Sequence, residues 1–491
     1  MLAGSLFSQE GHRLLLAPLA TRDWESPIPQ NAENLQAGKE VYEANCARCH
    51  GLDGKSRLAS NADLPVMPAD LTTFFVESLR DGELYFISTR GILSTVPGVV
   101  TSMPGFRYKL EENQHWQLVQ YLRELRRVQK IEEVKQLGPY PWNLPPGFPY
   151  PKAPADNPMT VEKVALGRHL FYDKRLSMNQ TQSCADCHKQ ELAFTDGKPR
   201  GVGSTGEVHP RGAMSLVNVG YNPVLTWANP NLDSLSEQAL APMFGDDPVE
   251  LGMGGQEDLL AERLSADAIY QRLFAAAYPG EMQPYSVDNI TKAIASFQRT
   301  ILSGGSPYDR YRRGDDPEAI SASAKRGENL FFSERLECAH CHGGLNFTAV
   351  VDYFGKGFAE VEFHNNGLYN LAGEFSYPKR NLGLFQFSRE PSDVGKFKPP
   401  TLRNIAVTAP YMHDGSLATL SDVLDHYAAG GRTVAAGDLA GVGADNPNKS
   451  ELIKPFQLTE QERADLIAFL ESLTDETVLT SPALSDPWPK N

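Results

Sequence analysis

The stretch Cys338-Ala-His-Cys341-His342 has the pattern Cys-x-x-Cys-His, and the chain contains this pattern three times. The other two copies are Cys46-Ala-Arg-Cys49-His50 and Cys184-Ala-Asp-Cys187-His188. The pattern is the attachment signature of c-type haem. Two thiols three residues apart can form thioethers to the two haem vinyl groups, and the adjacent histidine can then bind the iron from one face.

All six cysteines of the 491-residue chain lie in these copies, so none is left for a disulfide. A thioredoxin-like dithiol and half of a four-cysteine zinc site are the other common uses of such pairs. Neither requires a histidine directly after every pair. The sequence therefore predicts three covalently bound haems. The attachment residues are Cys46, Cys49, Cys184, Cys187, Cys338 and Cys341, and the axial histidines are His50, His188 and His342.

Length and composition predict a globular protein of about three domains with long loops. The chain is 41% hydrophobic and 22% charged and has 35 prolines. Its formal net charge of −15 argues against nucleic-acid binding, and no apolar run is long enough for a transmembrane segment. Because attachment of c-type haem normally requires export, we expect a periplasmic protein. Met1 to Ala20 offers only a short apolar stretch interrupted by proline, which is a poor secretory signal.

A second repeat precedes each haem motif. It has the form Gly-x-x-apolar-aromatic and occurs at Gly38–Tyr42, Gly167–Phe171 and Gly327–Phe331. We interpret each copy as part of a helix that enters a haem site. Helices with apolar residues three and four apart close the first and last units, over Glu112–Arg127 and Thr459–Leu473. The predicted fold is mainly α, with three tandem cytochrome c-like helical haem domains and long loops.

The expected domain boundaries follow from these repeats and from a proline-rich stretch. That stretch, residues 136–158, has so many prolines that it favours extended polyproline segments and is interpreted as a semi-rigid linker. We expect an N-terminal extension over residues 1–31, a first haem domain over 32–135, the linker over 136–158, a second haem domain over 159–320 and a third over 321–491.

The first haem domain resembles a small class I cytochrome c. Its motif lies near the start, an irregular middle follows, and Met103-Pro-Gly-Phe precedes the closing helix. Met103 is the candidate sixth ligand opposite His50, because a thioether ligand raises the reduction potential and suits electron transfer. Met67 is a rival ligand, and Met103 could instead be a core residue.

The last two thirds of the chain resemble the bacterial di-haem cytochrome c peroxidase and MauG superfamily. The resemblance depends on four stretches in the same order as in the family, namely 166–177, 293–300, 306–311 and 400–416. A further stretch, Gly203–Asn218 followed by Trp227, is closer to MauG-like members that modify proteins. The resemblance implies a peroxidatic haem at His188 and an electron-transfer haem at His342.

The resemblance also implies residues on the distal side of the peroxidatic haem. Such an iron needs an open sixth position for peroxide and an acid-base group that helps to break the O–O bond. By family correspondence, Gln238, Pro242 and Glu250 lie on this side, and Glu250 is the expected proton shuttle. Without the family correspondence, Glu250 would be interpreted as a solvated surface acid.

Tyr427 stands where the peroxidases have the methionine ligand of the partner haem, counting from His413-Asp-Gly415. Thr419–Asp422 has a capping-box pattern and Gly430-Gly431 supplies a helix stop, so Tyr427 is expected on the apolar face and His426 to the side. A phenolate is a hard anionic ligand that stabilises oxidised iron. We predict that Tyr427 binds this iron, and the likeness to MauG then implies that both haems share the oxidising equivalents. The alternative is a packed core tyrosine.

Three residues are candidates for the region between the two haems. Trp227 occupies the position of the family's inter-haem tryptophan, which relays charge, although an ordinary buried tryptophan is the alternative. His209 and His413 are polar candidates in the same region, and His413 is the better supported of the two.

Two further patterns, one for nucleotide binding and one for calcium binding, are weak evidence of function. Gly201–Gly206 has the pattern G-x-G-x-x-G, but prolines flank it and no strand or helix is expected beside it, so nucleotide binding is not expected. Family members often hold Ca²⁺ between the haems. The corresponding carbonyls are those of Thr408 and Pro410, but Gly212 replaces the expected asparagine.

The predicted function is that of a tri-haem oxidoreductase that uses H₂O₂ at a five-coordinate haem and, like MauG, oxidises a Trp or Tyr of a partner protein. The alternative is a peroxidase that reduces H₂O₂ to water with electrons from a cytochrome or quinol, delivered through the N-terminal haem. A non-enzymatic electron carrier is a third possibility, but it leaves Gln238 and Glu250 without a role.

Overall fold

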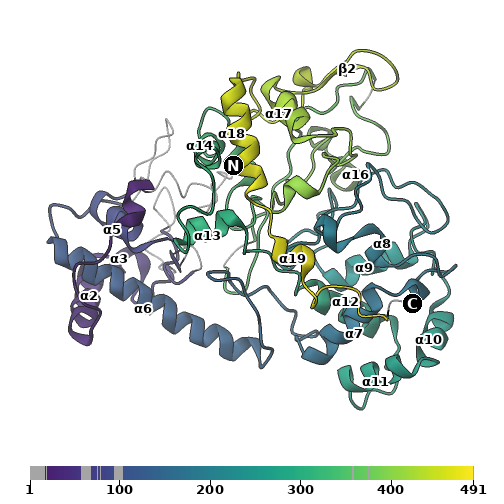
Figure 1. The fold of residues 1–491 in the computed structure, drawn as a ribbon, viewed down its shortest axis with the longest axis horizontal. Helices are drawn as coiled ribbons and strands as arrows, with labels where there is room; N and C mark the ends of the chain where they lie inside the picture. The colour runs from purple at the N-terminus through teal and green to yellow at the C-terminus, as the bar shows by residue number, and fades with distance from the viewer. Residues whose placement is uncertain are drawn as a thin grey trace. The chain divides into compact units, whose positions relative to one another are not determined.

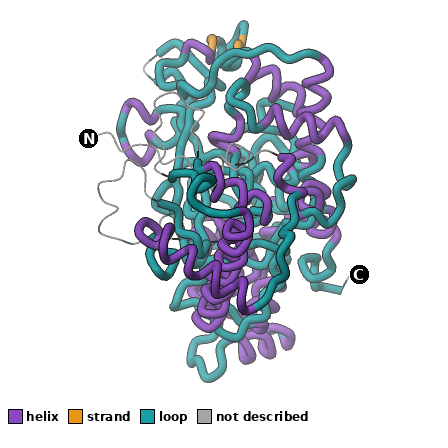
Figure 2. Tube along the Cα trace, turned by 90° about the vertical axis from the view of Figure 1, so that its left-hand side faces the viewer, coloured by secondary structure: helices purple, strands orange, loops and turns teal. Residues whose placement is uncertain are grey.

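The structure is a computed structural model that describes residues 17, 19–56, 68–73, 76–77, 79–92, 103–356, 359–373 and 375–489. This part of the chain is mostly helix and loop (Figure 2), and the strands β1 (Thr433–Val434) and β2 (Gly441–Val442) pair antiparallel. The predicted mainly α fold is confirmed. The chain divides into two compact units. The first consists of Met1–Gly138, Pro146–Pro149 and Phe354–Gly357, and the second contains the remainder.

The first unit is a small helical domain around one apolar core. Its core includes Val41, Tyr42, Trp116 and Val119. The closing helix begins at Glu112, as predicted, but continues well past Arg127. Arg126, which is buried, pairs with Glu133 two turns later in the extension, at 2.9 Å. The helices are α2 (Ala32–Asn45), α3 (Ala47–His50), α5 (Asp81–Arg90) and α6 (Glu112–Leu137), with the 3₁₀ helix η1 (Leu19–Asp23) before them.

The second unit contains two large apolar clusters, one around α7 and α12 and one around α14 and α18. Its α-helices are α7 (Val161–Phe171), α8 (Cys184–Cys187), α9 (Leu235–Phe244), α10 (Glu257–Ser265), α11 (Ala268–Ala277), α12 (Val287–Gln298), α13 (Pro307–Arg313), α14 (Ala322–Phe331), α15 (Cys338–His342), α16 (Phe385–Ser388), α17 (Leu420–Ala428), α18 (Glu460–Glu471) and α19 (Glu476–Thr480). Its 3₁₀ helices are η3 (Lys174–Leu176), η4 (Gln190–Leu192), η5 (Val219–Tyr221), η6 (Pro391–Asp393), η7 (Ile405–Val407) and η8 (Gly443–Asp445).

The glycine of each Gly-x-x-apolar-aromatic repeat lies where two helices cross. A Cβ at Gly38 would be 2.0 Å from a backbone oxygen of α6, and Cβ atoms at Gly167 and Gly327 would each be 1.9 Å from a backbone oxygen of α12 and α18. Figure 1 shows α7 beside α12 and α14 beside α18. Only glycine lets the helices approach so closely, and the aromatic residue of each repeat is buried in the adjoining core. The repeats are therefore helix-packing signals.

The second unit is internally similar. Asn218 and Asn404 each adopt the left-handed conformation, with φ of 58° and 60°, and each begins a 3₁₀ helix. The backbone N–H of Asn218 donates to the oxygen of Ile301, which follows α12, at 2.8 Å. In the same way, the N–H of Asn404 donates to the oxygen of Leu473, which follows α18, at 3.0 Å. Asparagine tolerates this conformation better than most residues. Two copies of one helical scaffold therefore make up the unit.

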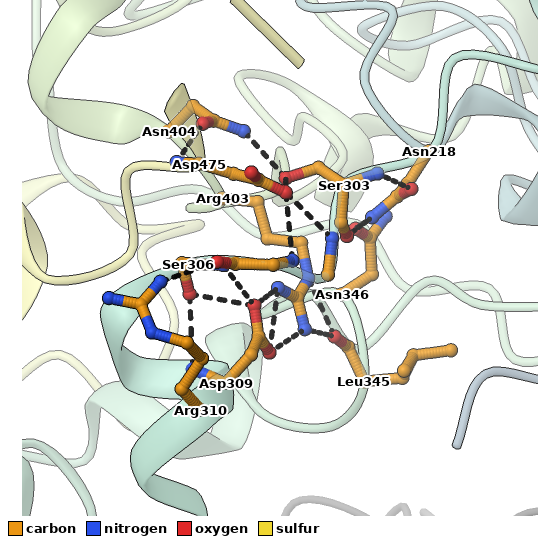
Figure 3. A network of polar contacts seen from close by, with 12 residues as sticks. Asn218, Ser303, Ser306, Asp309, Arg310, Leu345, Asn346, Arg403, Asn404 and Asp475 are labelled. Atoms are coloured by element: carbon orange, nitrogen blue, oxygen red, sulfur yellow. Dashed lines mark hydrogen bonds and ion pairs between the residues drawn. The ribbon is translucent and has the colours of Figure 1, made fainter. Parts of the chain in front are cut away.

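A buried polar network joins the two halves of the second unit (Figure 3). The side chain of Asn218 bonds both the N–H and the C=O of Ser303, at 2.8 Å each. Ser303 Oγ in turn accepts from Asn404 Nδ2 at 3.1 Å and donates to Asp475. Beside it, Arg403 and Asp309 form a buried ion pair at 2.9 Å. Since every member is bonded to its neighbours, the network fixes one half against the other.

The C-terminal tail crosses from one half of the second unit to the other. It follows α18 of the second half, yet Val478 and Leu484 are buried in the apolar cluster around α7 and α12, and Trp488 packs against that cluster. The tail therefore adds a further link between the halves. The predicted boundaries at 159, 320 and 491 stay a prediction.

Candidate haem and peroxide sites

Each of the three haem motifs forms one short helical turn. The turns are α3, α8 and α15, and none of the six cysteines is in a disulfide. Residues three apart lie on the same side of a helix, so each pair of thiols can reach one macrocycle. Burial raises the pKa of Cys184 and of Cys338 to about 12, because the free thiolates would be poorly solvated. Such thiols suit thioether bonds, which carry no charge.

The histidine of each motif is held in the orientation that iron binding requires. Nδ1 of His50 lies 2.8 Å from the oxygen of Ala69, and Nδ1 of His188 lies 2.8 Å from that of Phe194. Nδ1 of His342 lies 3.2 Å from the oxygen of Pro400. A carbonyl can only accept, so the proton is on Nδ1 and the lone pair on Nε2 is available to a metal.

Burial also lowers the pKa of all three axial histidines, and that of His342 reaches about 4. The imidazoles are therefore neutral at physiological pH, as iron ligation requires. The residues present fit covalently bound c-type haem at each motif.

In the first unit, Met103 packs against the same apolar cluster as Cys46. Its loop is anchored to the end of α5: the N–H of Ile92 donates to the oxygen of Met103 at 3.3 Å, and the N–H of Phe106 donates to the oxygen of Ser88 at 3.0 Å. Ligation of the iron by Met103 opposite His50 stays a prediction. The rival ligand Met67 lies outside the described residues.

Glu250 lies near the second haem motif. Burial chiefly, and then neighbouring charges that include Glu250, raise the pKa of Cys184 and Cys187. Burial also raises the pKa of Glu250 to about 6. A partly enclosed carboxyl group with this pKa can both accept and return a proton near neutral pH. Its role as the proton shuttle stays a prediction.

The backbone of Glu250 is held from both sides. Its oxygen accepts from Ser204 N–H at 2.7 Å, and the N–H of the following residue, Leu251, donates to the oxygen of Pro242 at 2.9 Å. Pro242 and the half-buried Gln238 both belong to α9. The structure thus brings the three residues predicted for the distal side to one region.

The G-x-G-x-x-G stretch supports this arrangement. It forms a tight loop closed by a bridge between Val202 and Val208, without the helix of a nucleotide fold. A Cβ at Gly203 would be 1.9 Å from the oxygen of Val249. The glycine pattern therefore allows close contact with the Glu250 backbone. No pattern in the sequence indicated this packing role.

Tyr427 lies near the third haem motif. Its helix, α17, begins with the predicted capping box between Thr419 and Asp422 and ends before Gly430. Burial chiefly, with the neighbouring charges of Cys341 and Cys338, raises the pKa of Tyr427 to about 12. A hydrogen bond from the Asn366 side chain acts in the opposite direction, because it favours the phenolate. Asn366 was not found from the sequence.

His426 does not point away from the core as expected. It is 4% exposed, and burial lowers its pKa to about 4. Its ring meets the ring of Tyr427 edge to face at 4.9 Å. The helix has nine residues, and its buried residues are Leu424 and His426, so burial extends beyond the apolar stripe. The expectation that His426 lies aside is wrong for this reason.

Trp227 and His413 are brought together in the second unit. Their ring centroids are 6.5 Å apart in an edge-to-face arrangement. Gly212 connects them: its oxygen accepts from Trp227 Nε1 at 2.9 Å, and its N–H donates to the oxygen of His413 at 2.9 Å. His413 stacks on Phe397 at 3.8 Å, and burial lowers its pKa to about 4. A neutral, buried histidine therefore lies beside the predicted relay.

His209 and the candidate calcium ligands are the remaining residues predicted for the region between the two haems. His209 is half-buried, and its Nδ1 accepts from the N–H of Arg211 at 3.1 Å. The hydroxyl of Thr408 donates to Ile405, and Pro410 lies in the same loop. Gly212 has no side-chain oxygen, so an ion there would lack one ligand that the family supplies. Calcium binding stays a prediction.

These sites define a class: a c-type haem protein with a carboxyl group near one haem motif and a tyrosine near another. Residues 161–317 match the family model for di-haem cytochrome c peroxidase, and residues 33–122 match that for the cbb3-type cytochrome c oxidase subunit III. The second match confirms the predicted cytochrome domain at the N-terminus.

Known proteins place the chain within this class. It is 38% identical to methylamine utilization protein MauG of Methylorubrum extorquens over 343 residues, 69% of this chain and 85% of that protein. It is 34% identical to cytochrome-c peroxidase IdrP1 of Denitromonas iodatirespirans over 364 residues, 70% of this chain and 89% of the relative. The crystal structure of a MauG-like protein associated with microbial copper homeostasis is 48% identical, with a TM-score of 0.70, and covers 72% of this chain and 100% of that protein. The chain belongs to the di-haem cytochrome c peroxidase and MauG family and is a haem oxidoreductase.

Within the described residues, every helix is too short or too polar to span a bilayer.

Proposed function

We propose that the chain is a periplasmic tri-haem enzyme that uses H₂O₂ at the His188 site and oxidises a Trp or Tyr side chain of a partner protein. Bound haem c supplies iron that can take up peroxide and hold oxidising equivalents. The observation that carries the proposal is the contrast between two sites in one unit, with Glu250 near the second motif and Tyr427 near the third.

Glu250 is the proton shuttle of the proposed reaction. Its carboxylate accepts a proton from the peroxide and returns it to the departing oxygen, which needs a pKa near the working pH. A pKa of about 6 meets this requirement. The bonds from Ser204 and to Pro242 hold its backbone still while the proton moves. Gln238 is the second polar side chain of this region.

Tyr427 is the proposed sixth ligand at the His342 site. A buried hydroxyl with a pKa of about 12 remains protonated unless a cation is close to it, and ferric iron is such a cation. Asn366 provides a donor to the phenolate oxygen. An anionic ligand favours the oxidised metal, so this site suits holding an oxidising equivalent better than receiving an electron first. Trp227, with His413 beside it, is the proposed relay between the two sites.

A second candidate function is reduction of H₂O₂ to water. It is favoured by the N-terminal domain, which matches an electron-transfer cytochrome and presents Met103 to the core that contains Cys46. Electrons from a cytochrome or quinol would then enter through His50 and Met103. The two functions use the same peroxide site. They differ in the electron donor that returns the oxidised site to its resting state, which is a protein side chain in the first and a cytochrome or quinol in the second.

An electron paramagnetic resonance spectrum of the oxidised protein tests both functions. We expect one high-spin signal from the His188 site, one low-spin His/Tyr signal and one low-spin His/Met signal. Three six-coordinate low-spin signals would exclude peroxide chemistry at His188. Addition of H₂O₂ then separates the functions: an oxidised form that persists until a protein substrate arrives supports the first, and rapid turnover with a reduced cytochrome supports the second.

A further inference from the structure

Lys398 is a buried cation whose partner is missing from the described residues. The residue is 2% exposed, and no carboxylate among the described residues lies close enough to its ammonium group to affect the pKa of Lys398. Two other buried cations of this unit are paired with carboxylates: Arg403 binds Asp309 at 2.9 Å and Arg312 binds Glu328 at 3.2 Å. An unpaired buried charge is strongly unfavourable, so Lys398 requires an anion that the protein does not supply.

The position of Lys398 indicates where this anion comes from. Its backbone N–H donates to the oxygen of Trp227 at 2.8 Å. Two residues later, the oxygen of Pro400 accepts from Nδ1 of His342 at 3.2 Å. The preceding residue, Phe397, stacks on His413 at 3.8 Å. Lys398 therefore lies in the segment that connects the predicted relay with the axial histidine of the third motif.

A second cation in this region also lacks an acidic partner among the described residues. The guanidinium of Arg211 lies over the ring of Phe397 at 5.4 Å and donates to two side-chain amide oxygens, those of Asn381 and Gln386. Burial lowers the pKa of Arg211 to about 10 and that of Lys398 to about 8, and no neighbouring carboxylate opposes either shift. Amide oxygens carry no charge, so Arg211 has no carboxylate partner among the described residues.

We propose that the Lys398 ammonium binds a propionate carboxylate of the haem held by His342, with Arg211 as a second cation for the propionates of this region. Each c-type haem brings two propionates, and Cys338 and Cys341, which would hold this haem, belong to the same unit as Lys398. A cation at this position stabilises the reduced iron relative to the oxidised iron and so raises the reduction potential. The inference depends on the haem at His342, which the proposed function also uses, but not on any step with peroxide.

The test uses the haem-loaded protein and the variant Lys398→Met, which keeps the chain length and removes the charge. In a redox titration followed by the low-spin signal of the His342 site, the midpoint potential is expected to fall by at least about 59 mV, the equivalent of a tenfold change in a one-electron equilibrium. The matched control is Lys292→Met, which removes a lysine paired with Asp156 and Asp288 at 3.1 and 2.9 Å. Equal potentials for Lys398→Met and the unaltered protein would overturn the proposal.

A crystal structure of the unaltered haem-loaded protein keeps the test decisive if Lys398→Met does not fold. A propionate oxygen within about 4 Å of Lys398 Nζ is expected. The proposal fails if Nζ binds a protein carboxylate or contacts only uncharged atoms. Failure of the peroxide reaction with an intact Lys398–propionate pair would instead contradict the proposed function alone.

Discussion

The two halves of the second unit have the same scaffold and different distal residues. Each half has a helix pair that crosses at a glycine, Gly167 or Gly327, and an asparagine in the left-handed conformation. Each has an axial histidine whose Nδ1 donates to a backbone oxygen. The half with His188 has Glu250, on a loop held by other loops, whereas the half with His342 has Tyr427, on a regular helix.

This difference teaches that the scaffold determines where a haem is held and the distal element determines what the iron can do. A loop can place a carboxyl group near the metal without filling the coordination position. A tyrosine on a capped helix is in a fixed position and can remain bound. Under the proposed function, the half with His188 is the open half, the half with His342 is the closed half, and both use the same kind of axial ligand.

Glu250→Gln tests the open half and has the largest expected effect. The amide has nearly the same shape but cannot accept a proton, so the reaction with H₂O₂ should slow by about 10²- to 10⁴-fold. Stopped-flow spectra of the His188 site measure this rate. Glu207→Gln is the matched control, because Glu207 accepts from Val249 N–H in the same loops at 3.0 Å but is more exposed. An unchanged rate in Glu250→Gln would remove this residue from the mechanism.

Gly167→Ala and Gly327→Ala test whether the halves share a scaffold. Each new Cβ would be 1.9 Å from a backbone oxygen, so the crossing helices must separate. Both variants should lower the free energy of unfolding by about 1–3 kcal/mol or more, since the obstacle is backbone rather than a movable side chain. Chemical denaturation of the haem-loaded protein measures this. Gly201→Ala, where a Cβ would have its nearest neighbour at 3.7 Å, is the control. A large loss of stability in only one of the two variants would contradict the conclusion that the halves share a scaffold.

Much of this arrangement could be predicted from the sequence, because local patterns determine it. Thiol and histidine spacing identified the haem motifs, and the capping box at Thr419 and the stop at Gly430 gave the helix of Tyr427. Long-range contacts gave no such signal. The Asn366 donor lies far from Tyr427 in the sequence, and the packing of Gly203 against Val249 depends on two loops that only the fold brings together.

The burial of two polar residues could not be predicted from the sequence either. Lys398 and His426 are polar residues whose burial the sequence pattern does not indicate, yet they are 2% and 4% exposed. The periodicity of one helix identifies one apolar face, but it does not report what packs on the other faces.

Tyr427→Met tests the closed half. A thioether favours reduced iron, so the potential of the His342 site should rise by more than the roughly 59 mV of a tenfold change, and the His/Tyr signal should be replaced by a His/Met signal. The oxidised form that both halves share should then be lost. Tyr411→Phe is the control, since it removes a tyrosine hydroxyl that donates to the oxygen of Ile405 in the same unit. If the His/Tyr signal survives in Tyr427→Met, another residue binds this iron.

The pH dependence of the peroxide reaction should report on the half with His188 alone, because Glu250 belongs to that half. The pKa of Glu250 is raised to about 6, so its carboxylate is ionised above this pH and protonated below it. Because the proton acceptor is the ionised form, the rate should be constant above about pH 7 and about tenfold lower at pH 5. Glu250→Gln should lose this decline. A rate that stays flat in the unaltered protein between pH 5 and pH 7 would mean that a different group accepts the proton.

Thr419→Ala has the smallest expected effect and addresses how rigid the closed site must be. It removes the cap of α17, in which the Thr419 side chain accepts from Asp422 N–H at 3.1 Å. The loss should cost about 1 kcal/mol of stability and loosen the helix that presents Tyr427. Thr160→Ala removes the equivalent cap of α7, where the side chain accepts from Lys163 N–H at 3.1 Å, and should cost about the same. Only Thr419→Ala should broaden the low-spin signal of the His342 site, because only α17 carries a proposed ligand. Equal broadening in both variants would mean that the signal reports general loosening of the unit and not the position of Tyr427.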